Sequence, residues 1–515
     1  MTLTLLTIFV FACQSGGETS NLLNISGSGP NDELGAAVAA LDDLNGDGVQ
    51  EIGATTRTRV EVFSGADGSL LYTLDGRFRV ERGLDYNFDG IDEILTSGSG
   101  GVYVYSGIDG ALLLTISGLG YTMASIPDQD GDGGPDLVIG DPTYHDAGND
   151  LYPGKVHLCS GTTGAVIWEL EGFEDFSHFS YNITLIDDLD HDGMNDLAVS
   201  APFLWDWMYG WIYFLSSADG SVIDSIKGGR HEAFGQSIDT MPDLDGDGLR
   251  DLLVGAPGVD SGSNGRAMVY SVGTKNVLIS VGGQGWAGFS VSALGDSDGD
   301  GWPDFLVGEP RKGINSGKVT AYSGLDGHAL WAINGGSRGM LGWSVADAGD
   351  VDGDGLSDAI GGAPYSQHFG GYDTYGMVKV GGFNPWISTD LTLLSLGQAT
   401  HWSYDLDFPV DAAGLQYTLL ISSHGTGPFT QGVSIPLSPD VLLKRTWQAN
   451  YPGAAECGAI GVLDSDGNAT IHARMLNGGP WSFVIGHTLY LAAVAYPTGH
   501  DPLFSTAAMP LIIMP

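Results

Sequence analysis

Basic residues are scarce in this chain. Only 19 Lys and Arg stand against 63 Asp and Glu in 515 residues, which gives a formal net charge of −44. Proteins that bind nucleic acid neutralise its phosphates with clustered Lys and Arg, so this composition argues against a nucleic-acid partner. Cysteine is equally scarce, and Cys13, Cys159 and Cys457 are too few for a disulfide framework. We expect Cys159 and Cys457 to be buried thiols, with one bridge between them as the alternative.

The chain also lacks a hydrophobic run long enough to span a membrane. Its apolar N-terminal stretch, residues 3–12, has the length of the hydrophobic region of a signal peptide. It ends in Val-Phe-Ala before Cys13, which resembles a bacterial lipobox. We therefore predict that residues 1–21 are a signal peptide and tether of an exported bacterial protein, either secreted or a lipoprotein of the outer membrane or cell surface. Cys13 is the candidate for lipidation, and a buried strand is the alternative interpretation of the run.

Glycine, by contrast, is abundant. The chain has 81 glycines, 43% hydrophobic residues and only 16% charged residues. This composition suits an all-β protein with many tight turns and a real core. The length predicts two or three domains.

One acidic loop organises the chain. Residues 243–251 place acids at loop positions 1, 3, 5 and 9 (Asp243, Asp245, Asp247 and Asp251), with Gly248 at position 6. Alternating carboxylates and a residue that allows a sharp turn can wrap a hard cation, and Ca²⁺ takes about six to eight oxygen ligands. The closing acid at position 9 makes the loop tight enough to join two strands.

Six further copies of this loop occur, and successive copies start 42 to 60 residues apart. A fixed motif at such a period predicts a repeat architecture. We predict up to seven structural Ca²⁺ ions, one in each loop. The ligands expected in the other six loops are Asp43, Asn45, Asp47 and Glu51; Asp85, Asn87, Asp89 and Glu93; Asp128, Asp130, Asp132 and Asp136; Asp188, Asp190, Asp192 and Asp196; Asp296, Asp298, Asp300 and Asp304; and Asp350, Asp352, Asp354 and Asp358.

Short phrases flank the loops. Phe-Gly at 234–235 precedes the fifth loop and Gly-Ala-Pro at 255–257 follows it. These phrases resemble the FG-GAP repeat of the integrin alpha-subunit head, a seven-bladed β-propeller. The resemblance covers residues 22–384 and implies that fold for them. It is weaker in the first three repeats, where residues 79–82 and 121–124 keep little of the phrase.

Each repeat also contains a strand, a Ser-Gly-x-Asp-Gly turn and a second strand, which is a hairpin signal. The last repeat contains only the first of these strands, residues 377–380. We predict that residues 22–26 supply its missing outer strand and close the ring, which hides exposed strand edges.

Insertions follow the Ala-Pro-like phrase in repeats 3 to 7. In the integrin-like arrangement they lie on the face opposite the metal loops, and variable loops often carry binding. Two insertions are rich in aromatic residues, which suit an extracellular protein or glycan as partner. The candidate ligand-binding residues are Trp205, Trp207, Tyr209, Tyr365, His368 and Tyr372.

Residues 385–515 form a different module. The metal loops stop, and short strand-like runs alternate with Gly, Pro and Asn turns. This pattern predicts a C-terminal β-sandwich. Phrases such as Gly-Thr-Gly at 425–427 resemble a module common in exported proteins of planctomycete-type bacteria.

Catalytic motifs are not evident. Gly-Gly-Ser-Arg-Gly at 335–339 matches a nucleophile elbow, but nothing after it reads as the helix that this motif needs. We predict a non-enzymatic, calcium-binding scaffold for cell-surface adhesion or recognition, without catalytic residues. The alternatives are a hydrolase or lyase acting on extracellular polysaccharide or lipid, and an architectural component of a surface assembly. Candidates for a catalytic centre in the enzyme alternative are Tyr144, His145, Asp146, His178 and His368.

Overall fold

The computed structural model describes residues 18–384, except residues 20, 203–208, 259–263, 299–300, 354 and 367–373, and a set of strands beyond residue 384. Within this part of the chain the regular structure is β-strand apart from one short helix, α1 (Lys312–Asn315). No described helix has the length and apolarity needed to cross a bilayer. The all-β prediction is confirmed.

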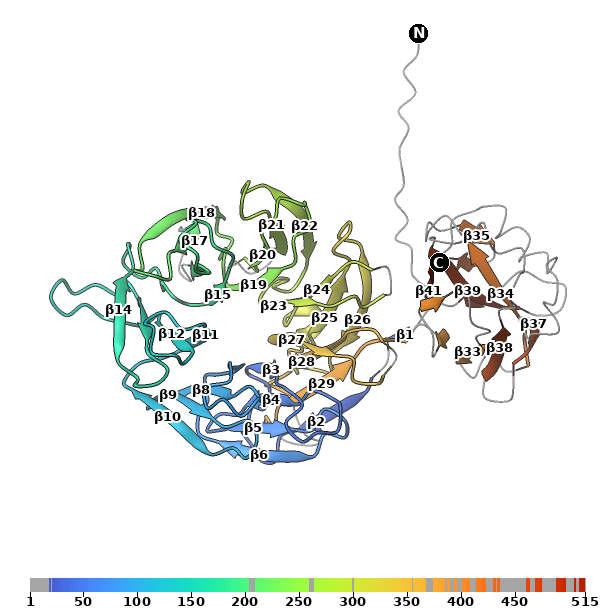
Figure 1. Ribbon diagram of the computed structural model, residues 1–515, viewed down its shortest axis with the longest axis horizontal. Coiled ribbons are helices and arrows are strands. Elements are labelled where there is room, and N and C mark those ends of the chain that lie inside the picture. Colours follow the sequence, from blue (N-terminus) through green and yellow to red (C-terminus); the bar gives the residue numbers. More distant parts are fainter. Residues whose placement is uncertain are drawn as a thin grey trace, which may run out of the picture.

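Seven four-stranded antiparallel sheets stand around a common axis as the blades of a propeller (Figure 1). The first six blades follow the chain in order. From inner to outer strand they are β3 (Val38–Ala40), β4 (Ile52–Thr55), β5 (Val60–Phe63) and β6 (Leu70–Leu74); β7 (Arg79–Arg82), β8 (Ile94–Gly98), β9 (Gly101–Tyr105) and β10 (Leu112–Ser117); β11 (Thr122–Ile126), β12 (Asp136–Asp141), β13 (Lys155–Cys159) and β14 (Val166–Glu171); β15 (Ile183–Leu185), β16 (Leu197–Ala201), β17 (Tyr209–Leu215) and β18 (Val222–Arg230); β19 (Ser237–Met241), β20 (Asp251–Ala256), β21 (Gly265–Tyr270) and β22 (Val277–Gly283); and β23 (Val291–Leu294), β24 (Asp304–Gly308), β25 (Lys318–Tyr322) and β26 (Ala329–Asn334).

The seventh blade combines the two ends of the propeller segment. Three of its strands are β27 (Ser344–Gly349), β28 (Asp358–Gly362) and β29 (Met377–Gly381), and the fourth is the N-terminal strand β2 (Leu23–Ser26). Leu23 pairs with Val380 and Ile25 with Val378. Next to it, β1 (Glu18–Thr19) pairs with β30 (Phe383–Asn384). The N-terminal strand thus lies where the incomplete last repeat requires one.

Hydrophobic contacts between neighbouring blades form the core. Each of seven clusters joins two adjacent blades, and one of them joins the last blade to the first through Ile25, Val378 and Ile52. The second strand of a blade is covered on both faces, so every residue of β8 and β20 is buried. A single blade therefore cannot bury its own core, and stability requires the whole ring.

Beyond residue 384 the described chain also consists of strands. They are β31 (Ile387–Thr389), β32 (Leu393–Ser395), β33 (His401–Asp407), β34 (Gln416–Ser422), β35 (Phe429–Gln431), β36 (Val433–Ile435), β37 (Ile460–Val462), β38 (Asn468–Arg474), β39 (Thr488–Tyr496), β40 (Phe504–Ser505) and β41 (Met509–Met514). They form one sheet of β31, β33 and β38, one built on β32, β41, β39, β34 and β37, and a β35–β36 hairpin. The packing of these sheets into a sandwich stays a prediction.

Ring closure by β2 gives the first testable prediction. Ile25 is buried in the cluster between the last and first blades, whereas its neighbour Asn24 is exposed. Ile25→Ala leaves a cavity there, so we expect it to lower the free energy of unfolding by about 2–4 kcal/mol. Urea denaturation of the calcium-loaded protein measures this. Asn24→Ala is the control, and equal effects of the two substitutions would show that β2 does not pack on the ring.

Candidate metal centres

Each acidic loop connects the inner strand of a blade to its second strand, and its own side chains hold its shape. In the fifth blade, Asp243 accepts hydrogen bonds from Gly246 N at 2.6 Å and Gly248 N at 2.8 Å. Asp247 Oδ1 accepts another from Leu249 N at 2.9 Å. Both glycines have positive φ angles, of 80° and 92°, which glycine adopts at little cost. The carboxylates are therefore held in place by the backbone before any ligand binds.

The closing carboxylate of the loop is buried. Asp251 is 0% exposed, and its Oδ2 accepts a hydrogen bond from Leu244 N at 2.8 Å. Its Oδ1 is also buried but has no hydrogen-bond partner, and the same holds for Oε1 of Glu51 and of Glu93. An unpaired buried carboxylate oxygen is costly. Several of the loops thus contain an oxygen atom that lacks a positively charged neighbour.

The acids of a loop lie close together. The described residues contain seven groups of at least three metal-binding side chains whose ligand atoms lie within 4.8 Å of one another. Five of these groups are Asp43, Asp47 and Glu51; Asp85, Asp89 and Glu93; Asp128, Asp130 and Asp136; Asp188, Asp190 and Asp192; and Asp243, Asp245 and Asp247. Such a cluster of carboxylates repels itself unless a cation lies between its members.

Burial and mutual repulsion raise the pKa values of the closing acids. Burial, with a smaller contribution from the neighbouring loop aspartates, raises the pKa of Glu51 and of Glu93 to about 7. The same causes raise the pKa of Asp251 to about 6, and burial raises that of Asp304 to about 8. A hydrogen bond from the backbone N–H at loop position 2 lowers each of these pKa values, but by less than burial raises them.

These features fit a hard divalent cation. Ca²⁺ binds carboxylate, amide and carbonyl oxygens, and the acids at positions 1, 3, 5 and 9 would hold it. It would supply the positive charge that the unpaired oxygens of Glu51, Glu93 and Asp251 lack. Asn45 and Asn87 stand at position 3, where each amide oxygen accepts the backbone N–H of position 5 at 2.9 Å.

Not all predicted ligands can be placed. Asp300 and Asp354 lie outside the described residues, whereas the closing acids Asp304 and Asp358 of their loops are buried. Cys13 and Cys457 also lie outside them. Cys159 is a buried free thiol in β13.

Two of the six candidate ligand-binding residues are described. Tyr209 begins β17, is 39% exposed, and has Lys227 Nζ 4.1 Å from its ring centroid. Tyr365 is half-buried against Trp343, with ring centroids 5.3 Å apart. Trp205, Trp207, His368 and Tyr372 lie outside the described residues.

The catalytic candidates of the enzyme alternative make local contacts. Tyr144 Oη donates to Glu171 at 3.1 Å, and His145 Nε2 lies 3.1 Å from Asp150. Asp146 accepts hydrogen bonds from its own loop. None of these described residues lines the cavity in the central channel, where the inner strands of all seven blades meet.

The structure reveals an aromatic group that the sequence did not indicate. The rings of His145 and Tyr152 stack at 4.3 Å, and those of Tyr152 and Phe176 at 5.2 Å. Tyr152 is 40% and Phe176 48% exposed. The residues come from two different loops, so no single stretch of sequence marks the group. We call His145, Tyr152 and Phe176 the aromatic stack.

Comparison with known proteins supports an integrin-like propeller. The model of the FG-GAP repeat matches residues 234–271. Integrin alpha-V of Gallus gallus is 35% identical over 156 residues, which cover 28% of this chain and 15% of that protein. Integrin alpha-5 of Xenopus laevis is 30% identical over 211 residues, covering 37% and 19%. The matches thus span about a fifth or less of these relatives' length.

One solved structure is also similar, though distantly. The crystal structure of the V. cholerae biofilm matrix protein Bap1 has a TM-score of 0.41 at 15% sequence identity. The similarity covers 71% of this chain and 91% of that one.

Substitution of Asp251 should raise the melting temperature in a buffer without calcium and lower it in a buffer with calcium. In the metal-free fold the pKa of Asp251 is about 6, against roughly 3.9 in an unfolded chain. Below about pH 4 the carboxyl is protonated in both states and burying it carries no charge penalty. As the pH rises through about 6 the group ionises, and the stability that its protonated form gave to the folded state is lost. Asp251→Asn has no charge to bury, so at pH 8 in excess chelator we expect it to melt at a higher temperature than the wild type.

In millimolar calcium the same variant should melt at a lower temperature, because a ligand is missing. Differential scanning calorimetry at pH 5 and pH 8 measures both effects. Asp219→Asn, in an exposed turn outside the metal loops, is the control and should change little in either buffer. A shift of Asp251→Asn in the same direction in both buffers would contradict this account of the loop.

Proposed function

We propose that the chain is an exported, calcium-stiffened propeller that serves as a non-enzymatic scaffold for adhesion or recognition. The observation that carries this proposal is that Glu51, Glu93 and Asp251 each bury an unpaired oxygen in loops whose acids cluster within 4.8 Å of one another. A stabilising cation accounts for that arrangement, whereas catalysis does not require it. The integrin alpha relatives and the FG-GAP match support the same type of scaffold.

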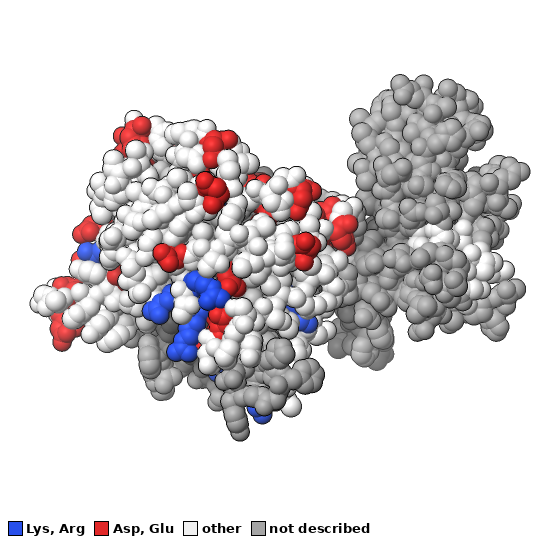
Figure 2. Space-filling view, turned by 90° about the horizontal axis from the view of Figure 1, so that it is seen from below, with Lys and Arg blue, Asp and Glu red and all other residues white. Residues whose placement is uncertain are grey.

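The two faces of the ring have different roles in this proposal. The metal loops connect the first and second strands and the insertions connect the second and third, so antiparallel pairing puts them on opposite faces. Figure 2 shows Asp and Glu along the upper edge of the ring, and Lys and Arg gathered below them with further acids in between. The acidic face holds calcium, and the insertion face is left to contact a partner.

The aromatic stack is the contact surface that we favour on the insertion face. His145 and Tyr152 lie in the insertion of the third blade, and Phe176 lies in the loop that leads to the fourth. Exposed aromatic rings contribute much of the energy at interfaces with proteins and sugars. An extracellular protein or glycan is the partner that this surface suits.

The ends of the chain complete the proposal. Residues 1–21 direct export, with Cys13 as a possible lipid anchor in a bacterial membrane. Residues 385–515 act as a β-sandwich spacer or anchor.

Calcium should stabilise the folded ring more strongly as its free concentration rises above the Kd of the sites. A ligand that binds only the folded state adds RT ln(1 + [L]/Kd) per site to stability. We expect excess chelator to lower the melting temperature clearly, and Mg²⁺ to restore it poorly, because Mg²⁺ is smaller and gives up its water reluctantly. Calorimetry with each ion measures this, and an unchanged melt in chelator would refute the calcium role.

Partner binding should depend on the aromatic stack. A glycan and surface-protein array, probed with and without calcium, should give a signal that falls at least about tenfold in Tyr152→Ala, as at an interface hot spot. Phe88→Ala is the matched control, because Phe88 is an exposed aromatic residue on the metal-loop face. Equal losses in both variants would place the contact elsewhere.

A further inference from the structure

The central channel of the propeller contains a second candidate site, independent of the proposed adhesion surface. Its cavity has a volume of about 790 Å³ and is lined by the inner strands of all seven blades. Ligand pockets for small molecules have volumes of roughly 300–1,000 Å³. The channel is therefore large enough for a small molecule.

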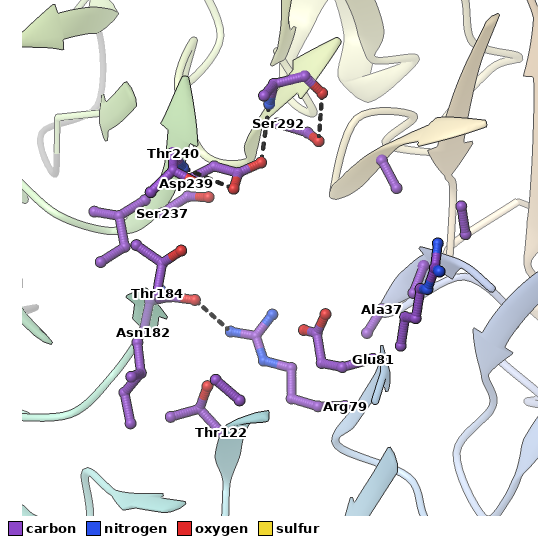
Figure 3. Close-up of a pocket in the computed structure, with 18 of the residues that line it drawn as sticks. Ala37, Arg79, Glu81, Thr122, Asn182, Thr184, Ser237, Asp239, Thr240 and Ser292 are labelled. Atoms are coloured by element: carbon purple, nitrogen blue, oxygen red, sulfur yellow. Dashed lines mark hydrogen bonds between the residues drawn. The ribbon is translucent and has the colours of Figure 1, made fainter. Parts of the chain in front are cut away.

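Two residues of each inner strand face this cavity, six and four positions before the first aspartate of the metal loop. Six blades place Ala, Ser, Thr, Asn or Asp at these positions. The second blade instead places Arg79 and Glu81 there (Figure 3). It is the only blade with long charged side chains at both positions, and it belongs to a repeat that departs from the FG-GAP phrase.

Several short polar side chains of the wall already have a structural partner. Ser290 Oγ accepts a hydrogen bond from Val345 N of the next blade at 3.0 Å, and Ser344 Oγ accepts one from Val38 N at 3.0 Å. Asp239 Oδ2 accepts one from Ala293 N at 2.9 Å. These contacts link neighbouring inner strands, so the presence of these residues is explained without a ligand.

Arg79 also contacts other blades, and its guanidinium carbon lies 5.6 Å from the ring centroid of Tyr121, but its donors are not all paired. One of its Nη atoms donates to Asn182 Oδ1 at 3.3 Å, and its Nε is buried without a hydrogen-bond partner. Asn182 is itself fixed, because its Nδ2 donates to Gln236 O at 2.7 Å. The guanidinium is thus held in place by Asn182 while most of its donors stay available.

Glu81 is available as well. Its carboxylate points into the channel (Figure 3), and among the described residues no hydrogen bond to it contributes to its electrostatics. Burial raises the pKa of Glu81 to about 7; the positive charge of Arg79 opposes this shift, and the nearby Asp239 adds to it. A second cationic group beside Glu81 would stabilise its ionised form further.

The geometry points to a small zwitterion as the ligand: we propose that the channel binds a free amino acid or short peptide, with its carboxylate on Arg79 and its ammonium group on Glu81. Arginine donates two parallel hydrogen bonds to a carboxylate. Residues two apart on a strand point the same way, with about 7 Å between them. A simple anion would be repelled by Glu81, and a simple cation by Arg79.

The test uses the full-length protein in saturating calcium. The probes are the common L-amino acids and glycylglycine at millimolar concentration, each with its N-acetyl form, which lacks the ammonium group, and its amide form, which lacks the carboxylate. Thermal shift identifies the probes that bind, and isothermal titration calorimetry measures their affinity. We expect at least one zwitterion to bind, and its two single-charge forms to bind at least about tenfold more weakly, as when a charge-assisted contact is lost.

Arg79→Met and Glu81→Gln should each cause a similar loss, whereas Ala346→Ser, elsewhere on the channel wall, should bind normally. If Arg79→Met does not fold, Arg79→Lys keeps the charge without the two parallel donors and should still bind more weakly. The proposal is overturned if no zwitterion binds, if an N-acetyl form binds as well as its parent, or if binding survives both substitutions. Each of these outcomes leaves the calcium dependence of the melt, and hence the proposed scaffold, untouched.

Discussion

The fold depends on how seven buried carboxylates are neutralised. Each closing acid lies at or just before the start of the second strand of a blade and is buried. One oxygen of Asp251 accepts a backbone N–H, and its other oxygen is buried without a hydrogen-bond partner, as is one oxygen each of Glu51, Glu93 and Asp196. The large negative charge of the chain is thus concentrated where metal binding would offset it, at the inner end of each hairpin.

Each acidic loop fixes the end of an inner strand, and the seven inner strands together form the inside of the ring. Because the second strands are buried on both faces, each blade depends on its two neighbours, and a ring with a missing strand would expose a hydrophobic edge. Closure by β2 removes that edge, and the cluster containing Ile25 continues the core from the last blade to the first. Ring closure therefore makes the blades one cooperative structure, which the proposed metal ions would stabilise further.

The repeated features could be predicted from the sequence, and the unique ones could not. Seven loops at a regular period determine seven blades, and a half-repeat at residues 377–380 requires a strand from elsewhere. The aromatic stack was not predictable, because Tyr152 and Phe176 meet only once two separate loops fold. The role of Arg79 and Glu81 was hidden for another reason. In the sequence they look like a degraded copy of the FG-GAP phrase.

That departure illustrates how a repeat protein can separate stability from function. A position that recurs in seven blades, such as the closing acid, supports the ring. Six blades supply short side chains to the channel wall, and several of these form hydrogen bonds to the next blade. The ring therefore does not need long charged side chains from one blade to join its inner strands. Arg79 bonds to Asn182 and offsets part of the charge of Glu81, but its Nε is buried without a hydrogen-bond partner. Incompletely paired charges are costly to bury, and their presence in one blade alone is best explained by a ligand that pairs with them.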